Sequence, residues 1–210
     1  MITLEYFYLT YLIHCIQAKK IAAARNSALR CYYQYQISGF KACQFVFLDE
    51  SGTDRRIGFR KTAWSPLGVA PIQRQSLHRG QRWQILPAYT LEGILACDVY
   101  QGTTDLSSFE SFLEFKVLPK CNPFPATNSV IVMDNASFHH SDRIRQMCAD
   151  AGVKLVFLSP YSPDFNPIEE FFSELKAFIR RNWALYVKMT DRSHESFAEY
   201  LRFAIDGSWK

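Results

Sequence analysis

Residues 45–51 read Phe-Val-Phe-Leu-Asp-Glu-Ser, an apolar run of four residues that ends at Asp49. A second run, Val-Ile-Val-Met-Asp-Asn at residues 130–135, ends in the same way at Asp134. Short apolar runs are typical of strands buried in an α/β sheet, and sites in such sheets gather at the carboxyl ends of the strands. An aspartate inside the run would be buried without a partner, at high cost, whereas one just beyond it can face solvent or a metal. The two runs therefore predict an α/β fold with an acidic site at these strand ends.

A third acid, Glu169, opens a helix that the sequence predicts from Pro167. The apolar residues of this helix fall on one face at i, i+3, i+4, i+7 spacing; they are Ile168, Phe171, Phe172, Leu175, Phe178 and Ile179. Glu170 points away from that face. Glu169 lies along its border, on the side of Lys176 and Arg180, so we expect Glu169 to reach a site at the sheet edge.

Each acid also has a plainer interpretation. Asn166 is a good N-cap, Pro167 suits the first helical position, and Glu169 then completes a capping box. Asp49 and Asp134 would in that case only begin turns. The coincidence of the three acids with the motifs around them favours a site, and carboxylate oxygens are the ligands that hard cations such as Mg²⁺ prefer.

Four motifs surround the acids: Phe47-Leu-Asp-Glu-Ser, Val132-Met-Asp-Asn-Ala-Ser-Phe-His, Leu158-Ser-Pro-Tyr-Ser-Pro-Asp-Phe-Asn-Pro-Ile-Glu-Glu and Ser173-Glu-Leu-Lys. Between Asp134 and Glu169 lie 34 residues. From about residue 19 to residue 206 the chain resembles the catalytic domain of the DDE transposases of the mariner-like superfamily and their superfamily-endonuclease relatives, a group known for this gap.

The resemblance implies an RNase H-like fold, a five-stranded mixed sheet flanked by helices. It also implies that Asp49, Asp134 and Glu169 hold two Mg²⁺ ions, with Mn²⁺ as a substitute, for DNA cleavage by water and strand transfer by the freed 3′-hydroxyl. The expected partners are DNA, as transposon ends and target, and further copies of the chain in a homodimer or larger complex.

Asn135 and His139 follow Asp134 closely, and we treat both as candidate auxiliary residues. The family carries a histidine in this region, so His139 is expected to orient a phosphate or a metal-bound water. A solvent-facing loop histidine is the plainer interpretation.

The net charge of +4 is unevenly distributed. Residues 54–82 hold one acid and seven cations, a local charge of +6 that leaves −2 for the rest of the chain; the cations are Arg55, Arg56, Arg60, Lys61, Arg74, Arg79 and Arg82. Such a patch is typical of a protein that contacts the phosphate backbone of a nucleic acid, although a solvated hairpin face has the same composition. Lys176 and Arg180 are expected to face the same polyanion.

The remaining segments complete the sheet. Residues 18–37, with Ile21, Ala24, Ala28, Leu29 and Tyr32, suggest a basic amphipathic helix. We expect strands at 82–90 and 93–100, joined as a hairpin through Leu91-Glu-Gly, helices at about 106–118 and 142–151, and a strand at 153–158.

We divide the chain into an N-terminal tail and helix, residues 1–40, and a catalytic domain, residues 41–206. The first part is too short for the helix-turn-helix units of a mariner-like transposase. The alternative function is therefore a truncated, non-catalytic transposon remnant that still binds DNA or a partner subunit. A ribonuclease H acting on RNA–DNA hybrids would share the fold and metals, but Ser162-Pro-Asp-Phe-Asn-Pro resembles the transposase group specifically.

The composition, with 48% hydrophobic residues over 210 positions, allows a full core. The sequence contains no membrane-spanning run, so no membrane partner is expected. Six scattered cysteines lack the spacing of a zinc or disulfide framework and favour reduced thiols in an intracellular protein. A nuclear location is expected only in a eukaryotic host.

Overall fold

The computed structural model describes residues 25–58, 64–72, 81–189 and 194–207. Four cations of the basic patch, Arg60, Lys61, Arg74 and Arg79, and the first part of the helix expected from residue 18 lie outside these ranges. Among the described helices, none is both long and apolar enough to cross a membrane.

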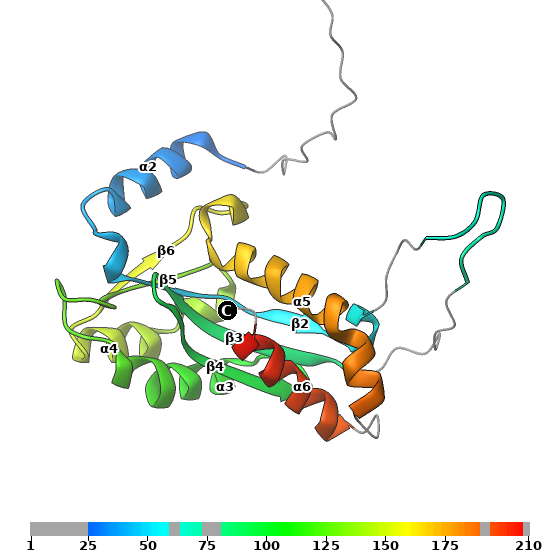
Figure 1. Ribbon diagram of the computed structural model, residues 1–210. Helices are drawn as coiled ribbons and strands as arrows, with labels where there is room; N and C mark the ends of the chain where they lie inside the picture. The colour runs from blue at the N-terminus through cyan, green and yellow to red at the C-terminus, as the bar shows by residue number, and fades with distance from the viewer. Residues whose placement is uncertain (1–24, 59–63, 73–80, 190–193, 208–210) are drawn as a thin grey trace, which may run out of the picture.

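A six-stranded mixed sheet forms the centre of the molecule (Figure 1). Its strands are β1 (Phe45–Leu48), β2 (Ser51–Thr53), β3 (Trp83–Thr90), β4 (Gly93–Gln101), β5 (Val130–Met133) and β6 (Lys154–Phe157). β1, β5 and β6 are parallel neighbours, and β3 pairs antiparallel with β1, β2 and β4. The expected mixed sheet is confirmed, with β2 as a short additional strand.

β1 and β2 are two parts of one strand path along β3. Phe47 pairs with Tyr89 and Ser51 with Ile85, so both parts follow the same register. In that register the gap at Asp49 falls opposite Pro87, which has no backbone N–H for a ladder hydrogen bond. The first acid of the candidate site therefore lies where the strand is interrupted.

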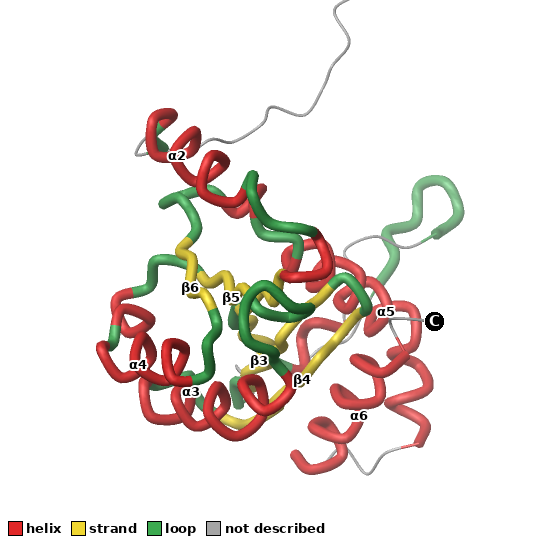
Figure 2. Tube along the Cα trace, turned by 90° about the vertical axis from the view of Figure 1, so that its left-hand side faces the viewer, coloured by secondary structure: helices red, strands yellow, loops and turns green. Residues whose placement is uncertain are grey.

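Helices cover both faces of the sheet, as Figure 2 shows. α3 (Leu106–Phe112) and α4 (Asp142–Asp150) enclose one apolar cluster, which includes Val46, Leu48, Ile131 and Met133. α5 (Ile168–Met189) and α6 (His194–Gly207) enclose another against β3 and β4. α6 was not predicted from the sequence, whereas α3, α4 and α5 begin close to the expected positions.

α2 (Ser27–Ile37) lies beyond β6 at the edge of the domain (Figure 1). Asn26 caps it by accepting hydrogen bonds from the N–H groups of Ala28 and Leu29. The expected apolar face is wrong, since Leu29 and Tyr32 are 46% and 60% exposed while Tyr33 is only 3% exposed. α2 packs through Tyr33 because its contacts are to distant loops, which local periodicity does not reveal.

Candidate active site

The parallel register of β1 and β5 brings the two strand-end acids together. Phe47 pairs with Val132, so Asp49 and Asp134, two positions further along each strand, lie side by side at the ends of strands about 4.8 Å apart. The residues that precede them, Leu48 and Met133, belong to the cluster under α3 and α4. Because side chains alternate along a strand, the acids project from the opposite face, which carries α5.

α5 supplies the third acid. Its buried face packs on the sheet through Ile168, Phe171, Phe172, Leu175 and Ile179. Glu169 is exposed at the border of this face and lines the same cavity as Asp49 and Asp134. Glu170, one residue on, is not part of that lining; its charge helps raise the pKa of Tyr89, a shift due mainly to burial. The structure therefore has the helical phase expected from the sequence.

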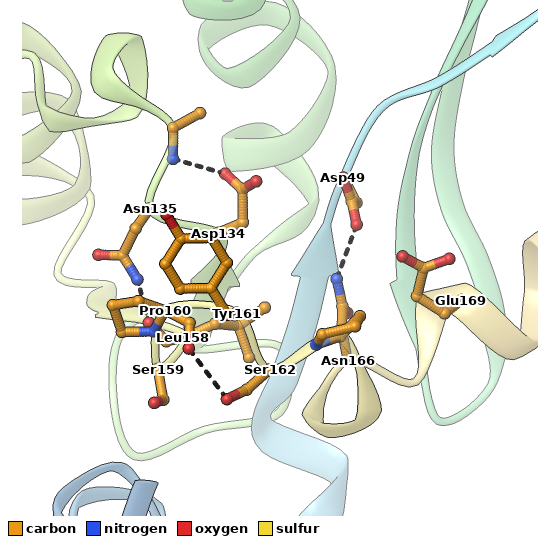
Figure 3. Close-up of a pocket in the computed structure, with 12 residues that line it drawn as sticks. Asp49, Asp134, Asn135, Leu158, Ser159, Pro160, Tyr161, Ser162, Asn166 and Glu169 are labelled. Atoms are coloured by element: carbon orange, nitrogen blue, oxygen red, sulfur yellow. Dashed lines mark hydrogen bonds between the residues drawn. The ribbon is translucent and has the colours of Figure 1, made fainter. Parts of the chain in front are cut away.

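The cavity has a volume of about 640 Å³ (Figure 3). Its walls come from the ends of β1 and β5, the segment after β6 and the start of α5, and its lining residues are Asp49, Asp134, Asn135, Ala136, Leu158, Ser159, Pro160, Tyr161, Ser162, Pro163, Asn166 and Glu169. Most of the third sequence motif thus forms one wall of this space.

The Asp49 carboxylate accepts hydrogen bonds from two neutral groups and lies near three other carboxylates. Its Oδ1 accepts the Glu50 N–H at 2.7 Å, and its Oδ2 accepts the Asn166 side-chain amide at 2.9 Å. Burial, together with the charges of Asp134, Glu50 and Glu169, raises the pKa of Asp49 to about 7. A proton or a cation is therefore needed to balance this carboxylate near neutral pH.

Asn166 does not cap α5, contrary to the plainer interpretation of the sequence. Its amide nitrogen is turned to Asp49, 117 positions earlier in the chain. Its side-chain oxygen is buried and accepts no hydrogen bond from the described residues. Asn166 is consequently a site residue, and no local signal distinguishes it from an ordinary cap.

Asp134 has a cationic partner. Its Oδ1 accepts hydrogen bonds from the Ala136 N–H at 2.8 Å and from His139 Nδ1 at 2.7 Å. Burial alone would raise its pKa, but these hydrogen bonds and the nearby histidine charges lower it below the usual range. Asp134 is therefore held in the ionised form.

His139 is fully buried between Asp134 and Glu50 and does not face solvent. Its Nε2 lies 3.0 Å from Glu50 Oε1, and its ring packs 4.5 Å from that of Phe109. Burial would lower its pKa, but the hydrogen bonds to Asp134 and Glu50 raise it to about 9. With both ring nitrogens bonded to carboxylates, His139 is placed to orient Asp134, and its expected role of orienting a phosphate or a metal-bound water stays a prediction.

Asn135 and Tyr161 lie at the rim of the cavity. The Asn135 side-chain amide donates to the Leu158 carbonyl, which ties the end of β5 to the segment after β6. Tyr161 is exposed and has a φ of 53°, in the left-handed region that is strained for a residue with a side chain. Asn135 was expected near the site, whereas Tyr161, Asn166 and Glu50 were missed.

A second hollow of about 540 Å³ gathers three of the described cations, Arg56, Arg82 and Lys176. Arg56 forms an ion pair with Asp54 at 2.5 Å. The Arg82 guanidinium lies against Gly52, where any Cβ would come within 2.5 Å of it. Lys176 follows Glu169 by two helical turns on α5, about 10 Å along the axis.

Arg55 and Arg180 do not line this hollow. Arg55 belongs to the short turn at residues 55–58, and Arg180 is exposed on α5. The structure thus brings together part of the predicted basic surface.

The three carboxylates fit a magnesium or manganese ion by their chemistry, since oxygen ligands suit both ions and Mg²⁺ commonly retains several waters. Within the described ranges, no three His, Cys, Asp or Glu side chains converge closely enough to share one ion. The acids instead surround a space large enough for ions with their waters. This arrangement suits a water-rich site that substrate oxygens help to complete.

The chain is similar to several solved transposase structures. It matches a Mos1 transposase paired-end complex with the left transposon end at 15% identity and a TM-score of 0.66, covering 93% of this chain and 60% of that one. A mariner Mos1 paired-end complex with Mg gives 13% identity, a TM-score of 0.68 and coverage of 92% and 59%. The Mos1 transposase catalytic domain with Raltegravir and Mg gives 13% identity and a TM-score of 0.61. This match covers 90% of the present chain and 86% of that domain.

These likenesses confirm the predicted RNase H-like fold. The chain spans about 60% of the length of the transposase chains that it matches in the paired-end complexes. No curated protein matches it. The family model described as DDE superfamily endonuclease matches residues 44–188, well over half of the chain and all three candidate acids. The chain therefore belongs to the DDE superfamily endonucleases.

Proposed function

We propose that this domain cuts DNA and joins the freed 3′ end to a target, with divalent ions held by Asp49, Asp134 and Glu169. The observation that carries this proposal is that three acids, from two neighbouring strands and one helix, line a single cavity at the strand ends. The transposases with the same fold were solved in paired-end and strand-transfer complexes and with Mg or Mn, which supports the same substrate and ions here.

Two bound Mg²⁺ ions would activate the attacking oxygen and stabilise the leaving oxygen of an in-line displacement. The chain's own part is to position ligands. Asp49 and Asp134 offer neighbouring oxygens from adjacent strands, and Glu169 offers a carboxylate from α5. Asn166 orients Asp49, and His139 orients Asp134 and keeps it ionised.

The DNA backbone would lie along the side of α5 that carries Lys176 and Arg180, next to the hollow lined by Arg56 and Arg82. Lysine and arginine in such a row neutralise successive phosphates, and binding then weakens as salt rises. Arg55 is a further proposed DNA contact; Arg60, Lys61, Arg74 and Arg79, which lie outside the described residues, stay predicted DNA contacts. Pairing of two transposon ends would require at least two copies of the chain.

The test is nicking of supercoiled plasmid by the purified chain with Mg²⁺ or Mn²⁺, with EDTA as the metal-free control. Wild-type protein and Glu170→Gln should nick, whereas Asp134→Asn and Glu169→Gln should not. Equal nicking by Asp134→Asn would remove that residue from the reaction. A folded wild-type chain that binds neither Mn²⁺ nor DNA ends would contradict the proposal and favour a transposon remnant.

A further inference from the structure

One carboxylate in the loop beside the site is held by two arginines from the α2 region. Arg25 Nη2 lies 2.8 and 2.7 Å from the two oxygens of Asp164, and Arg30 contributes Nη1 at 3.1 Å and Nη2 at 2.9 Å. The Arg25 and Arg30 side chains are only 16% and 17% exposed. Paired, charge-assisted hydrogen bonds of this kind fix geometry more strongly than a single surface ion pair.

The next residue of the loop is held by the same helix. The Arg30 guanidinium carbon lies 3.6 Å from the centre of the Phe165 ring, and the Tyr33 ring stacks on Phe165 at 5.5 Å. Tyr33 is buried in the cluster that contains Val130 and Val132 of β5. The contact therefore joins α2, the loop and the strand that carries Asp134.

This loop leads directly into the site. Asp164 and Phe165 form a 3₁₀ turn in which the Asn166 N–H donates to the Pro163 carbonyl at 2.9 Å. Asn166 then donates its side-chain amide to Asp49, and Glu169 follows three residues later. Rotation of the turn would move the donor to Asp49 and the start of α5 together.

We infer that Arg25, Arg30 and Tyr33 are positioning residues of the active site: through Asp164 and Phe165, α2 fixes the loop at residues 159–166 so that Asn166 reaches Asp49 and Glu169 faces the cavity. The three residues lie outside the span matched by the family model, residues 44–188. The effect on metal binding and cleavage rests on the proposed function. The effect on loop order does not.

The hydrogen bonds between Arg30 and Asp164 are tested by Arg30→Met, Asp164→Asn and the double variant. Lys116→Met is the matched control, because Lys116 pairs with Asp98 on β4 and, among the described residues, its ion pair does not involve residues 159–166. Backbone hydrogen exchange of the metal-free chain is measured first. Arg30→Met and Asp164→Asn should accelerate exchange at residues 162–170 by about tenfold or more, while the protection of β5 and of α5 beyond Leu175 stays at the wild-type level.

Mn²⁺ affinity of the same proteins, measured by calorimetry, is the second readout. We expect about tenfold weaker binding in each single variant, in line with the loss of partners that orient metal ligands. The loss in the double variant should be smaller than the two single losses combined, because both changes break the Arg30–Asp164 pair. Arg30→Lys should recover part of the loss, and Lys116→Met should match wild type.

Wild-type exchange at residues 162–170 in Arg30→Met and Asp164→Asn would overturn the inference. Accelerated exchange with an unchanged Mn²⁺ affinity would also overturn it, because the contact of Arg30 with Asp164 would then order the loop without positioning the metal ligands. A wild-type chain that binds no Mn²⁺ would instead count against the proposed function, and the exchange measurement would still decide whether α2 orders the loop.

Discussion

Asp49 and Asp134 end neighbouring parallel strands in the same register and face the same cavity, yet their surroundings are opposite. Burial and neighbouring negative charges raise the pKa of Asp49 to about 7. For Asp134, bonding to His139 and to the Ala136 N–H outweighs burial and lowers the pKa. The strand end sets where an acid lies, and the segments around it set its charge.

The two acids therefore differ in how much each would gain from a bound cation. Asp134 has a buried counter-charge in His139, which also binds Glu50 beside Asp49. The hydrogen bonds to Asp49 come from a backbone N–H and the neutral Asn166 amide. A divalent cation would therefore relieve more repulsion at Asp49 than at Asp134.

Nicking is the property for which the two acids should behave alike. Asp49→Asn, Asp134→Asn and Glu169→Gln should each lower the Mg²⁺-dependent rate by more than about 100-fold, since residues that merely orient metal ligands already contribute 10- to 100-fold. Plasmid nicking at saturating Mg²⁺ measures this. A loss of nicking confined to one of the three variants would contradict a single site formed by all three acids.

The stability of the metal-free chain should change in opposite directions in the Asp49 and Asp134 variants. Asp134→Asn leaves the buried His139 without one of its two carboxylates and should lower the free energy of unfolding by about 1–3 kcal/mol. Asp49→Asn removes a charge from a group surrounded by like charges and should raise the free energy of unfolding by about 2–4 kcal/mol at pH 8. Urea unfolding in EDTA tests both. Shifts of the same sign would contradict the electrostatic difference.

The strand-end acids and the phase of α5 could be predicted because both follow from periodicities that a short window contains. β2 could not, since Ser51–Thr53 has no apolar run and pairs only as a continuation of the β1 path. The roles of Asn166 and of the α2 arginines depend on partners more than 100 positions away. The burial of His139 likewise depends on Phe109, which no local pattern links to it.

Asn166→Ala removes the amide donor from Asp49 and leaves the hydrogen bonds to Asp134 in place. We expect Mn²⁺ affinity to fall by about tenfold, with little change in the stability contributed by the Asp134–His139 pair. Calorimetry on Asn166→Ala and wild type gives the ratio. Unchanged affinity would show that the carboxylate needs no such support.

The pH dependence of stability should come partly from Asp49. The folded chain keeps the Asp49 proton up to about pH 7, whereas the unfolded chain loses it near 3.8, so the stabilising contribution present below pH 3.8 is lost as pH rises through 7. In EDTA the wild-type free energy of unfolding should fall by about 2–3 kcal/mol between pH 5 and 8. Urea titrations of Asp49→Asn should show a shallower slope. Equal slopes would place the dependence elsewhere.

Glu170→Gln should have the smallest effect, because the side chain lies outside the cavity. Nicking within about twofold of wild type is expected, since surface substitutions rarely matter. A large loss of nicking would mean that Glu170, not Glu169, is the third acid of the site, and would contradict the helical phase of α5.

If Asp49, Asp134 and Glu169 together hold the divalent ions, crystals of the chain soaked in Mn²⁺ should reveal the ions bound to these three residues. An anomalous difference map should show manganese in the cavity, with carboxylate ligands from all three residues and none from Glu170. Manganese bound elsewhere, or a cavity without an anomalous peak at saturating Mn²⁺, would contradict this shared role of the three acids.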